Sequence, residues 1–422
     1  MDKLIIQSAE ILFADSAYYR KEADVVIEGG IITFVGDPGS VSNVSDAKVL
    51  AGAGRCLAPG FVDLNANFGE PGLETKEDFA SGCATAAAGG FTGVALQPNT
   101  QPPLHTRSEI SFVKNSTREN LVSVYPIGTI TKNREGNELA ELYDMTLAGA
   151  IAFSDGDRSL QHAGLMGRAL LYSKGFGGKI FAFAENKAIA GSAKMNEGNM
   201  STYLGMKGNP NMAEELMVSQ YLFLARYNEA PLHLSTISTA GSVNLVRAAK
   251  QEGLQVTCDV AAHHLLFTDE NLSTFDSNFK VKPPLRSTTD REALLEGLAD
   301  GTIDAIVSQH SPHEIEFKNV EFEIASYGIA GLQTVLPVLI RAGLSLEMIV
   351  EKLSTGPRSI LGLEPNHLAE GKMADLVLIN PDELWIFDKS SNRSKANNNP
   401  LFNTELKGKV NFIANRQQTI IF

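Results

Sequence analysis

The sequence predicts an α/β protein, a (β/α)8 TIM-type barrel accompanied by a small β-sandwich domain. Through the middle of the chain, short apolar β-type runs alternate with Ala- and Leu-rich amphipathic segments. This alternation is typical of parallel strands connected by helices. The two ends of the chain instead read as strands and turns. We therefore expect residues 1–57 and 366–422 to form the two parts of one β-sandwich, and residues 58–365 to form the barrel.

Eight candidate strands are present, as a closed barrel requires. They are residues 61–67, 93–98, 122–128, 150–154, 179–184, 231–235, 255–260 and 305–308. Helices are expected at 76–88, 108–114, 213–227, 242–252, 290–300 and 331–342. Eight strands with intervening helices favour a closed barrel over an open doubly wound sheet. Residues 388–399 are polar and Asn-rich with little to bury, so we expect a mobile loop there.

Composition is that of a globular, enzyme-sized protein. The chain has 422 residues, of which 43% are hydrophobic and 20% charged. Its net charge of -13 disfavours nucleic acid or an anionic membrane as a partner. The three cysteines have no paired zinc spacing and are expected to be reduced thiols. No targeting or membrane-spanning segment is recognisable, and we expect a cytoplasmic protein.

A series of motifs carries a family resemblance. The first barrel strand lies in APGFVDLNANFGEPG, beginning at Ala58, and is followed by AAAGGFT, QPNTQPP, AFSD and HLST. Further along are AHHLL, KPPLR, QHSPH and GIAGLQT. In order and spacing, the chain resembles dihydroorotases of class I, the multifunctional-complex type, in the amidohydrolase superfamily. The resemblance implies a barrel enzyme of pyrimidine biosynthesis that hydrolyses a C–N bond in a cyclic amide, with zinc as its cofactor.

The metal positions implied by this resemblance are mostly occupied by other residue types. The two histidines of the family's first strand are Asn65 and Asn67 here, and the fifth-strand histidine is Phe183. The eighth-strand aspartate, which binds metal and acts as general acid and base, is Gln309. A carboxamide is a weak zinc ligand and accepts no proton near neutral pH. We therefore expect no bound metal and no ordinary catalytic residue.

Two metal positions keep a possible ligand. Asp155 matches the family's bridging carboxylate and His233 its sixth-strand histidine. Each also has a structural interpretation, since Asp155 can cap a turn and His233 can be a hydrogen-bonded core histidine. The neighbouring pair His263 and His264 is not expected to bind metal, because adjacent strand residues point to opposite faces.

The substrate-binding positions are partly kept. Asn99 and His313 match family positions that hold the substrate carboxylate. The family's arginine after the histidine pair is Gly69, which removes a bidentate cation. Lys282 precedes PPLR where many relatives have asparagine, and it can restore a positive charge from another strand.

Three functions remain open on the sequence alone. The expected one is a catalytically silent family member that acts as a structural or regulatory partner of aspartate transcarbamoylase. We also expect this chain to form a homodimer. The second is an active dihydroorotase or related cyclic-amide hydrolase with a rearranged metal site. The third is a module that binds a small carboxylate without chemistry. Metal content combined with an assay on dihydroorotate distinguishes them.

Overall fold

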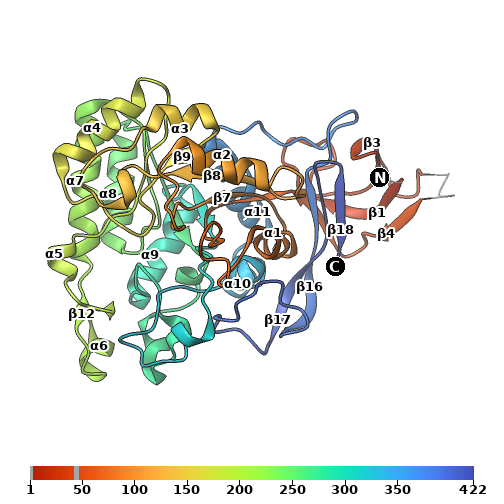
Figure 1. Cartoon of the computed structure of the whole chain (residues 1–422). Coiled ribbons are helices and arrows are strands. Elements are labelled where there is room, and N and C mark those ends of the chain that lie inside the picture. Colours follow the sequence, from red (N-terminus) through yellow and green to blue (C-terminus); the bar gives the residue numbers. More distant parts are fainter. Residues whose placement is uncertain (1–2, 42–46) are drawn as a thin grey trace.

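A closed barrel of parallel strands forms the larger part of the molecule (Figure 1). The computed structural model describes residues 3–41 and 47–422. The strands form two hydrogen-bonded groups, β6-β7-β8-β9 and β10-β13-β14-β15. Parallel bridges from Phe153 to Ile180 and from Ala66 to His310 join these groups into a ring. The strands are β6 (Phe61–Ala66), β7 (Phe91–Leu96), β8 (Ser123–Gly128), β9 (Ala152–Phe153), β10 (Phe181–Ala182), β13 (Leu232–Leu234), β14 (Val256–Ala261) and β15 (Ala305–Val307). The predicted barrel is confirmed.

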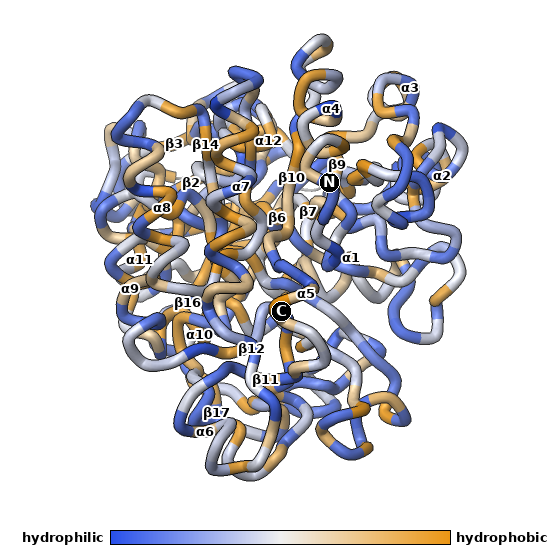
Figure 2. The backbone as a smooth tube through the Cα atoms, turned by 90° about the vertical axis from the view of Figure 1, so that its left-hand side faces the viewer, coloured by the Kyte–Doolittle hydropathy of each residue, from blue (hydrophilic) through white to orange (hydrophobic). Residues whose placement is uncertain are grey.

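Helices surround the barrel, and the apolar strand segments gather inside them (Figure 2). Their first turns begin at capping residues such as Asp78, Thr106 and Ser287, whose side chains accept from backbone N–H groups. The longer helices are α1 (Phe79–Ala88), α2 (Arg107–Ser116), α4 (Ala163–Lys174), α7 (Met212–Asn228), α8 (Ala240–Gln251) and α9 (Thr288–Ala299). The shorter ones are α3 (Leu142–Ala148), α5 (Lys187–Ala190), α6 (Asn199–Tyr203), α10 (Val335–Arg341), α11 (Leu346–Val350) and α12 (Gly356–Leu361).

The two ends of the chain build one eight-stranded sheet beside the barrel (Figure 1). Its order is β18-β17-β16-β5-β1-β2-β3, with β4 paired to β1. Strands β1 (Leu4–Ile11), β2 (Glu22–Glu28), β3 (Ile31–Gly36), β4 (Lys48–Ala51) and β5 (Cys56–Pro59) precede the barrel, and β16 (Leu376–Phe387), β17 (Thr404–Asn415) and β18 (Gln418–Ile421) follow it. A separate small core, which includes Ile27, Leu57 and Phe412, supports this sheet. We keep residues 57 and 366 as proposed domain boundaries.

Residues 388–399 are not the mobile loop that their composition predicts. The carboxamide of Asn398 accepts from the backbone N–H of His313 and donates to the carbonyls of Ser311 and Gly328. Asn399 donates to the carbonyl of Ala330. The side chains of Asn398 and Asn399 are thus buried and form hydrogen bonds to backbone groups of other loops. We call residues 388–399 the strap, because they cross the loops that follow β15.

None of the helices in the described part of the chain is both long and apolar enough to span a membrane.

Candidate functional site

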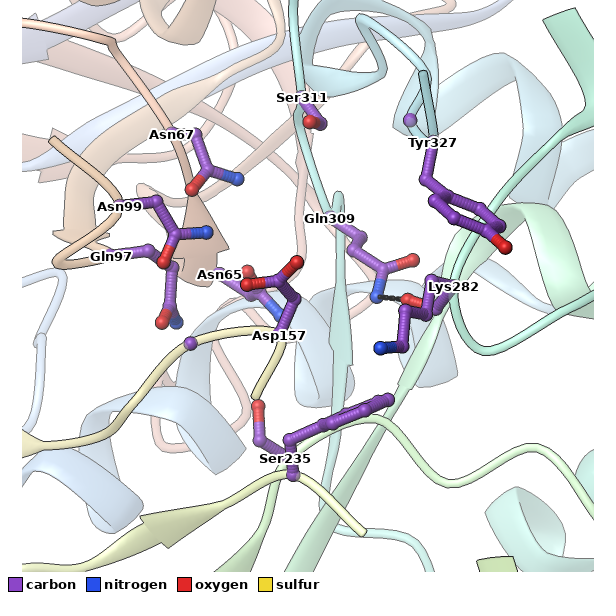
Figure 3. A pocket seen from close by; sticks show the side chains of 13 residues that line it. Asn65, Asn67, Gln97, Asn99, Asp157, Ser235, Lys282, Gln309, Ser311 and Tyr327 are labelled. Carbon is purple, nitrogen blue, oxygen red and sulfur yellow. Dashed lines mark hydrogen bonds between the residues drawn. The ribbon is translucent and has the colours of Figure 1, made fainter. Parts of the chain in front are cut away.

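A polar pocket lies at the carboxyl end of the barrel strands, where barrel enzymes place their sites (Figure 3). Its hollow measures about 550 Å³, part of which is open solvent. Carboxamides and one ammonium dominate its lining. The lining residues are Asn65, Asn67, Gln97, Asn99, Gly156, Asp157, Phe183, Ser235, Lys282, Gln309, Ser311, Tyr327 and Gly328. The structure therefore brings together Asn65, Asn67, Phe183 and Gln309, the four positions that the sequence resemblance singled out, with Asn99 and Lys282.

The carboxamides at one side of the pocket have unused acceptors. Asn67 donates to the carbonyl of His310 at 2.9 Å, and Asn65 donates to the hydroxyl of Thr236 at 3.4 Å. The side-chain oxygens of Asn67, Gln97 and Asn99 are buried and have no hydrogen-bond partner among the described residues. A buried acceptor left unpaired costs about 1–3 kcal/mol. These oxygens therefore favour a ligand that brings N–H groups, as a cyclic amide does.

A positive charge, that of Lys282, lies on the opposite side of the pocket, beside Phe183 and Gln309 (Figure 3). The Nζ of Lys282 lies 5.3 Å from the ring centroid of Phe183 and 3.0 Å from the carboxylate of Glu185. The side chain of Gln309 donates to the carbonyl of Lys282 at 2.8 Å. Glu185 itself lines a neighbouring hollow, which shares Lys282 and Tyr327 with this pocket.

Asp155 and His233 lie outside the pocket lining. The carboxylate of Asp155 accepts from the backbone N–H groups of Ile130 and Thr131. Desolvation by burial raises its pKa. Both ring nitrogens of His233 are engaged, one with Thr257 at 2.8 Å and the other with Asp259 at 2.9 Å. A metal at either residue would have to displace these partners.

His263 and His264 do not point to opposite faces. They lie in a 3-10 turn after β14, and their ring centroids are 4.6 Å apart. The strand geometry behind that expectation ends at Ala261, one residue before the turn. Desolvation by burial lowers the pKa of His264 to about 4.

A wider outer mouth continues the pocket toward solvent. The two hollows share Asn67, Asn99, Asp157, Ser311 and Tyr327. Gly69 and His313 lie in this outer mouth. The Nε2 of His313 contacts the carbonyl of Tyr327 at 2.9 Å, and desolvation by burial lowers its pKa to about 4.

Sequence reasoning missed three charged residues at this site, namely Arg134, Asp157 and Glu185. Asp157 and Glu185 lie in loops that follow strands, and Arg134 ends a short 3-10 turn after β8. Position after a strand is a signal for Asp157 and Glu185, whereas Arg134 is six residues beyond β8 and carries no such signal.

The donor set does not fit the zinc centre that the family resemblance implies. Within residues 3–41 and 47–422, no three His, Cys, Asp or Glu side chains are grouped so as to hold a metal ion. The pocket offers neutral carboxamides and a phenyl ring at those positions, and neither competes with imidazole or carboxylate for zinc.

Comparison with known proteins identifies the family. Residues 54–242 match the Dihydro-orotase-like family. A dihydroorotase from Caldanaerobacter subterraneus subsp. tengcongensis is 41% identical over 93% of this chain and 92% of its own length. The chain belongs to the dihydroorotase family. A dihydroorotase from Pelobacter propionicus is 38% identical over 96% of each chain, and one from Syntrophus aciditrophicus is 41% identical over 92% of each.

Solved structures of amidohydrolases share the fold of this dihydroorotase-family chain. An L-hydantoinase (dihydropyrimidinase) from Arthrobacter aurescens superposes with a TM-score of 0.85 at 24% identity, over 100% of this chain and 96% of the other. A D-hydantoinase (dihydropyrimidinase) from Thermus sp. gives a TM-score of 0.82 at 20% identity, over 99% and 95%. These neighbours establish the fold alone.

The comparisons correct the main functional expectation. A catalytically silent partner of aspartate transcarbamoylase was expected because the metal positions are substituted. Curated relatives at 38–41% identity over more than nine tenths of the chain are instead named dihydroorotase. The alternative, an active cyclic-amide hydrolase, is therefore the better supported one.

Proposed function

We propose that this protein is a cyclic-amide hydrolase of the dihydroorotase type whose site has been rearranged around a lysine ammonium. The observation that carries the proposal is the position of Lys282, whose Nζ lies against Phe183 while its carbonyl accepts from Gln309. Phe183 and Gln309 are two of the family's metal positions. A fixed positive charge there can stabilise the oxyanion that develops when water attacks an amide carbonyl.

The remaining parts of the reaction have candidates in and beside the pocket. Glu185 lies 3.0 Å from Lys282, in a neighbouring hollow that shares Lys282 and Tyr327 with the pocket, and we assign it to accept a proton from the attacking water and return it to the leaving ring nitrogen. The unpaired oxygens of Asn67, Gln97 and Asn99 can accept from the N–H groups of the ring. General-base catalysis contributes roughly 10²–10⁴-fold, so we expect slow but measurable turnover.

We also propose that hydrolysis by this protein does not require a zinc ion at the positions where the resemblance implies one. Asn65, Asn67, Phe183 and Gln309 supply no anionic or imidazole ligand. Charged side chains must therefore activate the substrate in place of a metal ion, and Lys282 and Glu185 form such a charged pair.

An assay in both directions tests the proposed function. Purified protein is incubated with dihydroorotate, and separately with carbamoyl aspartate, and ring opening or closure is followed by chromatography. One of the dihydroorotases named above serves as positive control. We expect the wild type to show turnover. The turnover should be lost in Lys282→Met and partly retained in Lys282→Arg. Absence of turnover in both directions, with an active control, overturns the proposal.

A further inference from the structure

Arg134 is a buried cation at the outer mouth of the pocket. Its side chain is only 9% exposed. The Nε donates to the carbonyl of Asp155 at 3.0 Å, and the guanidinium forms an ion pair with Asp157. Burial lowers the pKa of Arg134 because the charged form is desolvated. A guanidinium in such surroundings requires an anion beside it.

The backbone is strained where it holds this side chain. Asn133 and Arg134 both have left-handed backbones, with φ of 52° and 60°. Such a conformation costs a non-glycine residue about 1 kcal/mol or more, and it persists where surrounding contacts impose it. Two consecutive residues of this kind fix the direction of the Arg134 side chain.

Gly156 makes room for Arg134 beside Asn99. A Cβ at Gly156 would lie 2.1 Å from the Oδ1 of Asn99 and 3.0 Å from the Nη2 of Arg134. Because glycine has no Cβ, the carboxamide and the guanidinium can both approach this point. The Oδ1 of Asn99 is buried and has no hydrogen-bond partner among the described residues. The two side chains therefore line one polar corner, in which the guanidinium can face an anion and the carboxamide oxygen can accept from an N–H group.

The outer mouth is positively charged although the chain as a whole carries a net charge of -13. Five cationic side chains line it against two carboxylates. The cations are Lys76, Arg134, Arg158, Lys194 and Lys280, and the carboxylates are those of Asp157 and Glu323. A cleft lined by one sign of charge concentrates ligands of the opposite sign. This mouth therefore favours an anionic ligand.

Asp157 is a replaceable partner of Arg134. Its side chain is 57% exposed, whereas that of Arg134 is 9% exposed. An ion pair with one solvated partner contributes little net stability. The carboxylate of Asp157 can return to water at small cost, but Arg134 cannot. An incoming carboxylate can take the place of Asp157.

We propose that Arg134, positioned beside Asn99, is the anion-recognition residue of this site and binds the carboxylate of the cyclic amide in exchange for Asp157. The inference rests on the proposed function, since it assumes that the ligand is a ring bearing a carboxylate. The guanidinium that recognises the carboxylate is then on the segment after β8, and not at Gly69 in the loop after β6. Lys282, on the other side of the pocket, is not needed for the carboxylate and can contact the amide.

Calorimetric titration with two ring ligands tests this assignment. Dihydroorotate carries the carboxylate, and 5,6-dihydrouracil is the same ring without it. Charge-assisted hydrogen bonds contribute about 1.5–3 kcal/mol, so Arg134→Met should weaken dihydroorotate binding by roughly 10- to 100-fold. Binding of dihydrouracil should change less than about twofold. The affinity of Arg134→Lys for dihydroorotate should lie between those of the wild type and Arg134→Met, because lysine keeps the positive charge but lacks the two-pronged donor geometry of a guanidinium.

Two further variants make the test specific. Asp157→Asn removes the competing carboxylate and should tighten dihydroorotate binding. Lys194→Met removes one positive charge from the same mouth, where the Nζ of Lys194 lies 5.7 Å from the ring centroid of Tyr327. It should have a much smaller effect than Arg134→Met. Thermal unfolding of each variant verifies that it is folded.

The outcomes separate the inference from the proposed function. Dihydroorotate binding that is unchanged in Arg134→Met overturns the inference, even if the wild type hydrolyses the ring. Binding that depends on Arg134 and tightens in Asp157→Asn supports the inference, even if no hydrolysis is found. A wild type that binds neither ring overturns both.

Discussion

Gly69 lies in the loop after β6 at a position that has no room for a side chain. Its φ is +76°, and a Cβ there would lie 2.5 Å from the carbonyl oxygen of Leu73 and 2.9 Å from that of Glu77. No side chain fits without movement of the backbone. An arginine at this position would therefore require the loop after β6 to change its path.

A pair of glycine variants checks this reading. Gly69→Ala should lower the free energy of unfolding by roughly 2 kcal/mol more than Gly54→Ala does. Gly54 also has a positive φ, +72°, but nothing lies within 4 Å of the position of its Cβ. Urea unfolding of the two variants and the wild type provides the measurement. Equal destabilisation would mean that the loop relaxes freely around Gly69.

His264 gives the site a pH dependence of stability. It is fully buried, and its Nε2 contacts the carbonyls of Pro283 and Pro284, next to Lys282. Desolvation lowers its pKa from 6.5 to about 4. Between these two pKa values, His264 is protonated in the unfolded chain but not in the folded chain. The free energy of unfolding therefore falls as the pH drops from 6.5 toward 4.

The expected size of this effect is about 2 kcal/mol between pH 7 and pH 5. His264→Gln retains a donor for the proline carbonyls and does not titrate. The wild type should therefore lose about 2 kcal/mol more than His264→Gln over this interval, measured by urea unfolding at both pH values. Other titrating groups, such as Asp63, are common to the two proteins and cancel. Identical pH profiles would show that the folded protein tolerates a charged His264.

At the scale of elements, the strap formed by residues 388–399 holds the loops of the outer mouth in place. Asn398 makes three hydrogen bonds to the segments that carry Ser311, His313 and Gly328. Asn398→Ala should cost about 3 kcal/mol, because buried backbone groups lose their partners. The exposed neighbour Asn397 is the control, and Asn397→Ala should change stability by less than about 0.5 kcal/mol. Similar unfolding free energies for both variants would contradict the assigned role of the strap.

The sequence predicted the barrel because its strands and helices carry regular apolar periodicity and because many motifs lie in family order. It did not predict the strap, since asparagine-rich segments usually lack buried surface, and only the fold reveals the carbonyls that Asn398 and Asn399 satisfy. In the site, matching by motif located Asn65, Asn67 and Lys282. It could not locate Arg134, because a left-handed backbone at a non-glycine residue leaves no mark in the sequence.

On the scale of the whole molecule, one helix of the barrel exterior presents an apolar stripe to solvent. Four large apolar side chains on α7 are 49–80% exposed, namely Met212, Leu216, Phe223 and Tyr227. They recur at intervals typical of a helix seam. In an antiparallel pairing of two α7 helices, Leu216 meets Phe223 of the second copy, and Met212 meets Tyr227 of the second copy. The stripe is thus self-complementary about a twofold axis.

We therefore expect a homodimer through α7. Light scattering should give twice the chain mass of 45.4 kDa. Phe223→Glu would place two like charges near the axis of an acidic protein and should give a monomer. Leu384→Glu, at a 60% exposed site on β16 in the other domain, is the control and should remain dimeric. A wild-type monomer at all concentrations would refute this pairing.

The central claim is that this family member opens a cyclic amide with fixed charges, Lys282 foremost, instead of a zinc centre. The most direct measurement is the rate of dihydroorotate hydrolysis by protein stripped with a chelator, with zinc content determined on the same sample. We expect less than one zinc per chain before stripping, unchanged turnover after it, and no turnover in Lys282→Met. Activity that disappears on stripping and returns with zinc, at two zinc ions per chain, would contradict it.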